Sequence, residues 1–199
     1  MGLSDFLLAA VHSPHDSSIR AMAQASARTA YVAMCLALAW GVFAATGWIG
    51  RLSGRRATRV GHITLALFAI VLGTLHAAAF VFLTDPDEVF VPSTLLNPVS
   101  SAGKLRWSLG IVGLELVIAV LLTSLLRRFF IYRRWLNVHR VAYVAVALIV
   151  VHSWLGAFAN GNLSLLWLAG VTVLVPTILV TVLRFVSPRK LVSLGLLGD

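Results

Sequence analysis

Four of the six histidines lie in long apolar stretches of the sequence, and they fall into two matched pairs. His62 and His76 are 14 residues apart, and His139 and His152 are 13 apart. An imidazole can ligate a metal, relay a proton or hydrogen-bond to a neighbouring helix. Ionisable residues are rare inside membrane segments and usually mark a functional site there. The repeated spacing therefore favours a shared ligand over isolated packing contacts.

The composition places these stretches in a membrane. Hydrophobic residues make up 59% of the 199 residues and charged residues only 12%, which is about half the charged share of a soluble domain. Each apolar run approaches the ~20 residues that a bilayer crossing requires. Because lipid offers the backbone no hydrogen-bond partners, the runs must be helices. The sequence therefore predicts an all-α polytopic bundle of about five transmembrane helices.

The predicted spans form one transmembrane domain, residues 29–186. They cover residues 29–50, 58–84, 105–126, 136–159 and 163–186. Pro176 is expected to kink the fifth span, and Pro188 to mark its end. Residues 1–28 could form a short interfacial helix, in which His12 and His15 are expected to be solvated. Residues 187–199 are expected to form a cytoplasmic tail.

Basic residues gather in the connections on one side of these spans. Twelve of the sixteen lie there: Arg51, Arg55, Arg56, Arg59, Arg127, Arg128, Arg133, Arg134, Arg140, Arg184, Arg189 and Lys190. The other side carries the acidic Asp85, Asp87 and Glu88 in a loop of residues 85–104 that could cap the bundle or dock a partner. The positive-inside rule then predicts an outside N-terminus and a cytoplasmic C-terminus in the cell membrane. The net charge of +9 is explained by this bias, and no nucleic-acid partner is expected.

With this topology the second and fourth spans run in the same direction. His62 and His139 then share the cytoplasmic level, and His76 and His152 share the outer level. The two levels are separated by about 20 Å at a rise of 1.5 Å per residue. One histidine from each helix could therefore hold each of two b-type haems. Iron with two histidine ligands has no open position, which suits electron transfer.

Zinc fits these histidines less well, because no cysteine or carboxylate lies near them in the sequence to complete a tetrahedral site. The rotation of the helices fits one pair better than the other. Fourteen residues at about 100° each return to within about 40° of the starting direction, whereas thirteen miss by about 140°. The fourth span is therefore expected to tilt, to overwind locally, or to present its two imidazoles from different sides.

Charged residues near the histidines have two interpretations each. Arg59, Arg133, Arg134 and Arg140 lie near the inner level, where a guanidinium could pair with the carboxylates of a haem or with lipid headgroups. Lys104 and Arg106 have the same two interpretations at the outer level. Glu115, in the third span, could relay protons, accept a hydrogen bond from a ligand imidazole, or bond to a neighbouring helix.

Apolar and small residues near the histidines are weaker signals. Phe68, midway between His62 and His76, could stand between the haems or simply pack. Gly61, Gly73 and Ala77 could make room for a flat macrocycle, or let helices approach closely.

One stretch resembles the ferric reductase-like transmembrane family, which includes the membrane part of NADPH oxidases, ferric reductases and the haem-binding subunit of the bacterial methionine sulfoxide reductase system. It runs from Arg133 through Trp135, His139 and Tyr143 towards His152, similar to the family's basic-Trp-x-x-x-His-x-x-x-Tyr entry into a haem helix. Thr123-Ser124, and Gly61-His62 through His76, are similar to the family too. The 14 and 13 spacings resemble the family's, and the resemblance covers about residues 29–186.

The resemblance implies transmembrane electron transfer from an inner donor, through two haems, to an outer acceptor such as a redox protein, ferric iron or oxygen. The sequence departs from the oxidases because no flavin or nicotinamide domain is recognisable, and no G-x-G-x-x-G follows a strand. The donor is therefore expected to be a separate flavoprotein or membrane quinol. Two alternatives stay open: an accessory or assembly subunit of a larger membrane complex with structural haem, and a channel or transporter lined by histidines.

Overall fold

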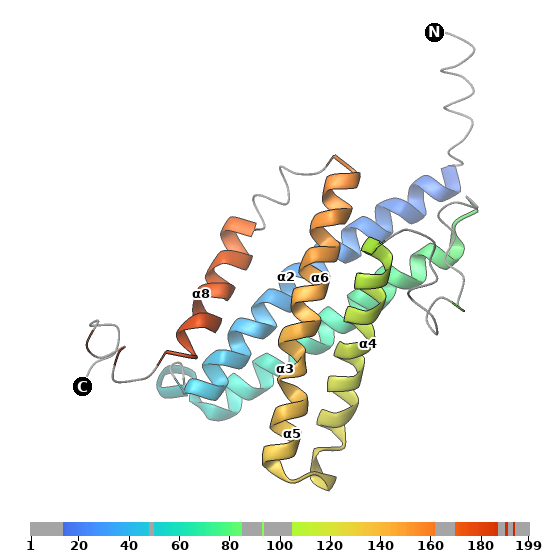
Figure 1. Ribbon diagram of the computed structural model, residues 1–199. Helices are drawn as coiled ribbons and strands as arrows, with labels where there is room; N and C mark the ends of the chain where they lie inside the picture. The colour runs from blue at the N-terminus through green and yellow to red at the C-terminus, as the bar shows by residue number, and fades with distance from the viewer. Residues whose placement is uncertain are drawn as a thin grey trace, which may run out of the picture. The chain divides into compact units, whose positions relative to one another are not determined.

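Helices make up the described structure. The computed structural model describes residues 14–47, 50–84, 93, 105–161, 170–186, 190 and 193, and no strand occurs among them. The long helices, labelled in Figure 1, are α2 (Pro14–Thr46), α3 (Gly50–Ala79), α4 (Leu105–Leu125) and α6 (Val141–Ala159). Shorter elements are η1 (Phe80–Phe82), η4 (Arg127–Phe129), α5 (Tyr132–His139), the π-helix η5 (Gly170–Leu174) and α8 (Val175–Leu183).

Four stretches among the described residues are long and apolar enough to cross a bilayer. They are Pro14–Thr46, Gly54–Phe82, Leu105–Leu125 and Tyr132–Ala159, and Thr172–Leu183 is a shorter apolar helix. Many large apolar side chains on them are exposed, such as Val71, Leu125 and Phe158. Patches of this kind are normal only where lipid or a partner covers them. The prediction of an all-α membrane bundle is confirmed, and the protein is an integral membrane protein.

The first two long helices differ from the predicted spans at their ends. α2 begins at Pro14, so residues 14–28 belong to the same helix as the predicted first span. It ends at Thr46, and the following Gly47 has a positive φ of 76° and donates its N–H to the carbonyl of Phe43. α3 bends at Gly54, where φ is 76° and ψ is 148°. A residue with a side chain would be strained in that conformation.

The chain divides into two compact units. The first contains Met1–Tyr31 and Ile70–Asn160, and the second contains Val32–Ala69 and Gly161–Asp199. α2 and α3 each contribute one part to each unit. His76, His139 and His152 therefore belong to the first unit and His62 to the second.

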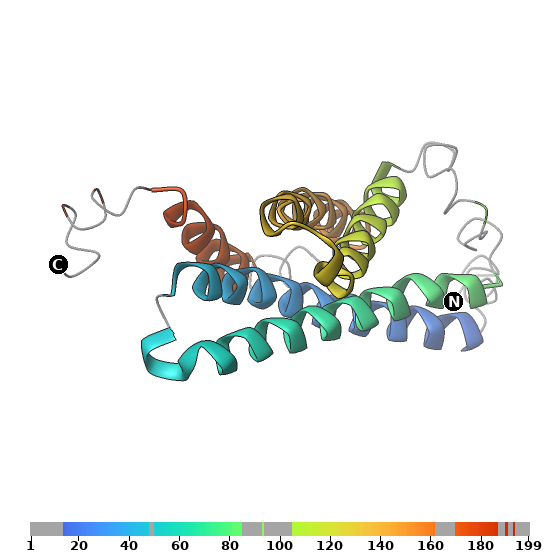
Figure 2. The ribbon, with the colours of Figure 1, turned by 90° about the horizontal axis from the view of Figure 1, so that it is seen from below.

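The first unit is built around α4 and α6, which lie side by side in Figures 1 and 2. A Cβ added at Gly113 of α4 would lie 2.6 Å from Cγ1 of Ile149 on α6 and 3.4 Å from the carbonyl oxygen of Ala145. Ala145 is fully buried. The two helices thus approach closely because small residues face each other, as is usual in membranes where no hydrophobic force drives helix association.

Hydrogen bonds join the start of α2 to residues 82 and 84 in the first unit. Asp16, which is buried, accepts hydrogen bonds from the backbone N–H of Thr84 at 3.1 Å and from its hydroxyl at 2.8 Å. The neighbouring His15 bonds through Nε2 to the carbonyl oxygen of Phe82 at 3.1 Å. His15 is exposed, as expected, but it also links the start of α2 to η1.

The second unit contains the later part of α2, the earlier part of α3, and α8. Cys35 and Val42 of α2 are almost fully buried. The hydroxyl of Thr177 on α8 donates to the carbonyl oxygen of Cys35 at 3.2 Å. Pro176 stands in the first turn of α8, directly after the π-helix, which agrees with the predicted distortion of the fifth span.

Some predicted features lie outside the described residues. They are residues 1–13 with His12, most of the 85–104 loop with its acidic residues and Lys104, Pro188, and most of the tail. The third and fourth predicted spans agree with α4 and with the α5–α6 stretch, to within a few residues at each end.

Candidate functional site

The first unit brings His76 and His152 together. The centres of their rings are 6.1 Å apart, and the ring planes are inclined by 63°. Phe80 meets His76 edge-on with ring centres 5.2 Å apart, and Trp107 meets Phe80 in turn at 5.7 Å. The predicted outer pair therefore meets in a largely aromatic setting.

Hydrogen bonds fix which nitrogen of each outer histidine carries the proton. Nδ1 of His76 lies 2.9 Å from the carbonyl oxygen of Ala23, and Nδ1 of His152 bonds to the carbonyl oxygen of Arg106. A carbonyl oxygen only accepts, so each Nδ1 must donate. In neutral rings, Nε2 then carries the lone pair, which is the arrangement that metal-ligating histidines adopt.

The rings of His76 and His152 are close enough to bind one metal ion together, since their centres are 6.1 Å apart and a bond from an imidazole nitrogen to a metal is about 2 Å long. Within the described ranges no three His, Cys, Asp or Glu side chains cluster. Histidine is a common ligand of haem iron, so this pair fits that group.

His62 is docked in the same way in the second unit. Its Nδ1 lies 2.9 Å from the carbonyl oxygen of Ala37 on α2. Its ring rests on Gly41, where an added Cβ would lie 3.0 Å from Cε1. Gly41, which follows Trp40 in the sequence, was not predicted to contact a histidine.

His139 reaches a side-chain acceptor instead of a backbone one. Its Nδ1 lies 3.4 Å from the hydroxyl oxygen of Ser124 on α4. That hydroxyl donates to the carbonyl oxygen of Val120 at 2.7 Å, so its oxygen is left to accept from His139. Nδ1 is thus the protonated nitrogen in all four histidines.

His62 and His152 both bond to a carbonyl that lies four residues before a glycine. The carbonyl of residue i in a helix points towards residue i+4, so a second donor reaches it only where that residue is small. Gly41 follows Ala37 by four residues, and Gly110 follows Arg106 by four. A Cβ at Gly110 would lie 2.8 Å from Cε1 and Nδ1 of His152. Glycine therefore leaves the acceptor carbonyl accessible and also leaves space for the imidazole ring.

Small residues near the ligands serve helix packing in the cases that the structure resolves. A Cβ at Gly61 would lie 2.6 Å from Nε1 of Trp40, so the indole occupies the space that we expected a macrocycle to use. At Gly73 the nearest contact is Leu114, at 3.8 Å. Of the two interpretations given for Gly61, close approach of a neighbouring helix is the one that this contact supports.

His139 is also held on its ring face. Trp135, one turn earlier on α5, stacks on His139 with ring centres 5.0 Å apart and planes inclined by 25°. The guanidinium carbon of Arg127 lies over the Trp135 ring at 4.7 Å. Trp135 was named only as part of the family pattern, but its position four residues before His139 was a usable signal.

The junction of α5 and α6 recovers part of the rotation that the 13-residue spacing lacks. The N–H of Tyr143 bonds to the carbonyl of Arg140 three residues earlier, at 3.0 Å, and Arg140 has a ψ of −18°. Both features are typical of a 3₁₀ turn, which advances farther per residue around the axis than an α-helix. Local overwinding, one of the three predicted solutions, is therefore present.

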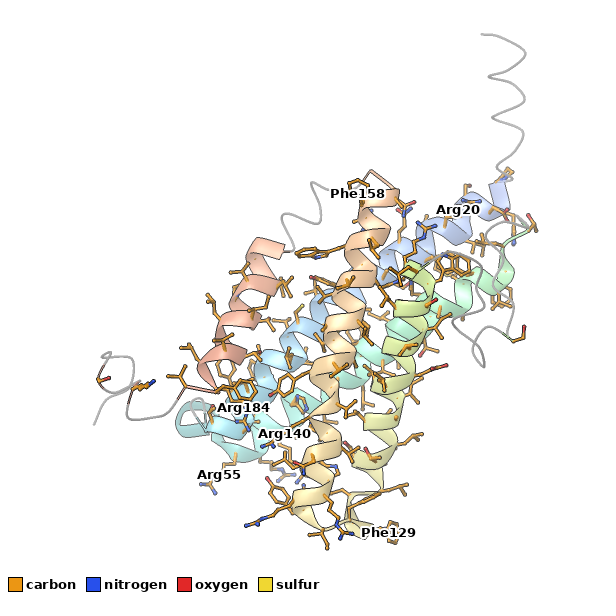
Figure 3. The ribbon with its side chains drawn as sticks, viewed as in Figure 1. Arg20, Arg55, Phe129, Arg140, Phe158 and Arg184 are labelled. Carbon is orange, nitrogen blue, oxygen red and sulfur yellow. The ribbon has the colours of Figure 1, made fainter. Side chains whose placement is uncertain are left out.

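The predicted charged and aromatic accessory residues are exposed. This holds for Arg59, Arg133, Arg134, Arg140, Phe68 and Glu115. Arg140, labelled in Figure 3, donates to the side-chain oxygen of Asn137 at 3.4 Å. The Nδ1 partners of the four histidines lie elsewhere, so Glu115 does not fill the predicted role of a hydrogen-bond acceptor for a ligand at Nδ1. The roles of the arginines and of Phe68 stay predictions.

A comparison with known protein families identifies one whose model matches this chain. The family model described as "Ferric reductase like transmembrane component" matches residues 25–150, which include His62, His76 and His139 and end two residues before His152. No curated protein and no solved structure matches the chain. Since the match spans more than half of the sequence, this protein belongs to the ferric reductase-like transmembrane family.

Proposed function

We propose that the protein carries electrons across the membrane through two haems b. His76 and His152 would hold the outer haem, and His62 and His139 the inner one. The observation that carries the proposal is the outer pair, with ring centres 6.1 Å apart and both Nδ1 atoms engaged by backbone carbonyls. The family membership supports the same activity.

The histidines have two tasks in this proposal. Haem b, when bound, supplies a one-electron iron couple. Each Nδ1–H bond fixes the ring orientation and raises the basicity of the opposite nitrogen, as it does at many metal sites. Two histidines at one iron leave no open position, so electrons can pass without substrate binding at the metal.

The charge distribution supports the proposed orientation of the chain in the membrane. Arginines such as Arg59, Arg133 and Arg134 mark the cytoplasmic side, so the N-terminus would be outside and the C-terminus in the cytoplasm. These arginines can pair with haem carboxylates or with anionic headgroups of the surrounding lipid. The donor would be a cytoplasmic flavoprotein or membrane quinol, and the acceptor an extracytoplasmic redox protein, ferric iron or oxygen.

A redox difference spectrum with haem quantitation tests the proposal. The purified protein should contain about two haems b per chain. His76→Ala and His152→Ala should each remove one haem, and His62→Ala and His139→Ala should each remove the other. His15→Ala, which alters an exposed histidine at the start of α2, should retain both. A folded protein without haem, or the loss of both haems from any one substitution, would contradict the assignment.

A further inference from the structure

Trp135 carries a buried polar atom that the protein itself does not satisfy. Among the described residues its Nε1 is buried and has no hydrogen-bond partner. A buried donor left without an acceptor costs about 1–3 kcal/mol, and buried tryptophan N–H groups usually find a partner. The acceptor for this N–H should therefore be a ligand.

The position of Trp135 indicates which ligand. Its ring stacks on that of His139 at 5.0 Å, so anything bound through His139 lies close to the indole. The strong hydrogen-bond acceptors at the edge of haem b are its two carboxylates. A carboxylate in a low-dielectric site also gains more from a donor than a neutral acceptor does.

Arg127 strengthens the case. Its guanidinium carbon lies 4.7 Å from the centre of the Trp135 ring and 5.5 Å from that of Tyr132. A cation over the ring face withdraws electron density from the indole and makes its N–H a better donor. The same contact adds positive charge near the proposed carboxylate.

We infer that Trp135 donates its indole N–H to a carboxylate of the haem held by His139, while its ring fixes the plane of the His139 imidazole. This rests on the proposed function. Because a donor to a carboxylate offsets its negative charge, the bond favours the reduced iron. Trp135 would therefore raise the midpoint potential of one of the two haems.

The test compares Trp135→Phe with the parent protein in a spectroelectrochemical titration. Phenylalanine keeps an aromatic face, although a smaller one, and removes the N–H. The variant should keep about two haems, with the potential of one haem lowered and that of the other unchanged. Trp154→Phe is the matched control, since Trp154 lies on α6 and is half exposed; it should leave both potentials unchanged.

Reconstitution with the dimethyl ester of haem b separates the N–H bond from stacking. With the ester, which has no carboxylate charge, Trp135→Phe should shift the potential much less than with haem b. Equal shifts with both cofactors would assign the effect to stacking and overturn the inference. An unchanged potential in a two-haem variant would overturn it too, whereas a parent protein without haem would defeat the proposed function instead.

A measurement on the parent protein covers the case in which Trp135→Phe does not retain haem. Ultraviolet resonance Raman bands report hydrogen bonding at indole N–H groups. The difference between samples carrying haem b and its dimethyl ester should contain a tryptophan band, and that band should persist in Trp154→Phe. Identical tryptophan bands in the two samples would overturn the inference.

Discussion

The two histidine-bearing segments, α3 and α5–α6, dock on their neighbours by different means. On α3, His62 and His76 both donate directly to backbone carbonyls of α2. On the α5–α6 segment only His152 reaches a backbone carbonyl of α4, while His139 reaches the hydroxyl of Ser124. The difference follows from the spacing of donors and acceptors along each pair of helices.

The spacing of the donor histidines equals that of the acceptor carbonyls between α3 and α2. Between the α5–α6 segment and α4 the two spacings differ by one residue. The acceptors Ala23 and Ala37 are 14 residues apart, as are His76 and His62. On α4 the carbonyls of Arg106 and Val120 are also 14 apart, but the donors there, His139 and His152, are only 13 apart. A 3₁₀ turn after His139 and an interposed hydroxyl together take up the difference.

This comparison shows where side chains can matter most. A backbone acceptor cannot be deleted by substitution, so the docking of His62 and His152 can be changed only through Gly41 and Gly110, which lie against their rings. The acceptor of His139 is a side-chain hydroxyl, which a substitution can remove. Substitutions of glycines and of Ser124 should therefore affect different histidines by different amounts.

The largest effect is expected for Gly110→Ala. The added Cβ would lie 2.8 Å from two atoms of the His152 ring, a distance that real contacts do not show. Displacement of the ring should cost about 1–3 kcal/mol, or roughly 5- to 150-fold in haem affinity. Gly41→Ala should have a smaller effect on the other haem, because its Cβ would lie 3.0 Å from His62. Transfer of haem to an apoprotein acceptor measures both.

Gly156→Ala is the control for these two variants. Gly156 lies inside α6, and a Cβ there would meet nothing within 4 Å. Alanine should keep both haems and stabilise the helix by up to about 1 kcal/mol. If Gly110→Ala and Gly41→Ala lose haem no faster than Gly156→Ala, the contacts of Gly110 and Gly41 with the histidine rings do not position the histidines.

The sequence predicted the fold and the proximity of His76 to His152, because both leave strong patterns. Long apolar runs predict spanning helices whatever their packing, and the spacing of the histidines does not depend on where each helix ends. The acceptors of the histidine Nδ1–H groups could not be predicted in the same way, since every residue has a backbone carbonyl. What the sequence does contain is the small residue four positions later, as at Gly41 and Gly110, and this signal has meaning only once the facing helix is known.

An intermediate effect is expected for Ser124→Ala. The change removes the acceptor of His139 Nδ1–H, and because this bond is long, at 3.4 Å, we expect a loss near the lower limit for a buried donor, about 1 kcal/mol. Haem should dissociate roughly five-fold faster from one site. Ser124→Thr should restore the parent rate, because threonine keeps a hydroxyl that can bond four residues back.

Thr123→Ala separates this role from helix bonding. The hydroxyl of Thr123 donates to the same carbonyl of Val120 at 3.0 Å, but Nδ1 of His139 bonds to Ser124. It should leave haem dissociation unchanged. Equal dissociation rates for Thr123→Ala and Ser124→Ala would show that the hydroxyl of Ser124 stabilises α4 and does not position His139.

The smallest effect is expected for Arg140→Gln, at the junction where the two registers are reconciled. The 3₁₀ bond joins backbone atoms of Arg140 and Tyr143, so it does not need the guanidinium. That side chain is exposed and makes one hydrogen bond of 3.4 Å, to Asn137. The free energy of unfolding should therefore change by no more than about 0.5 kcal/mol, as measured by thermal denaturation in detergent, and both haems should remain. A drop of ten-fold or more in haem affinity would instead show that the guanidinium binds a haem carboxylate, and the junction would then be part of the cofactor site as well as a correction of register.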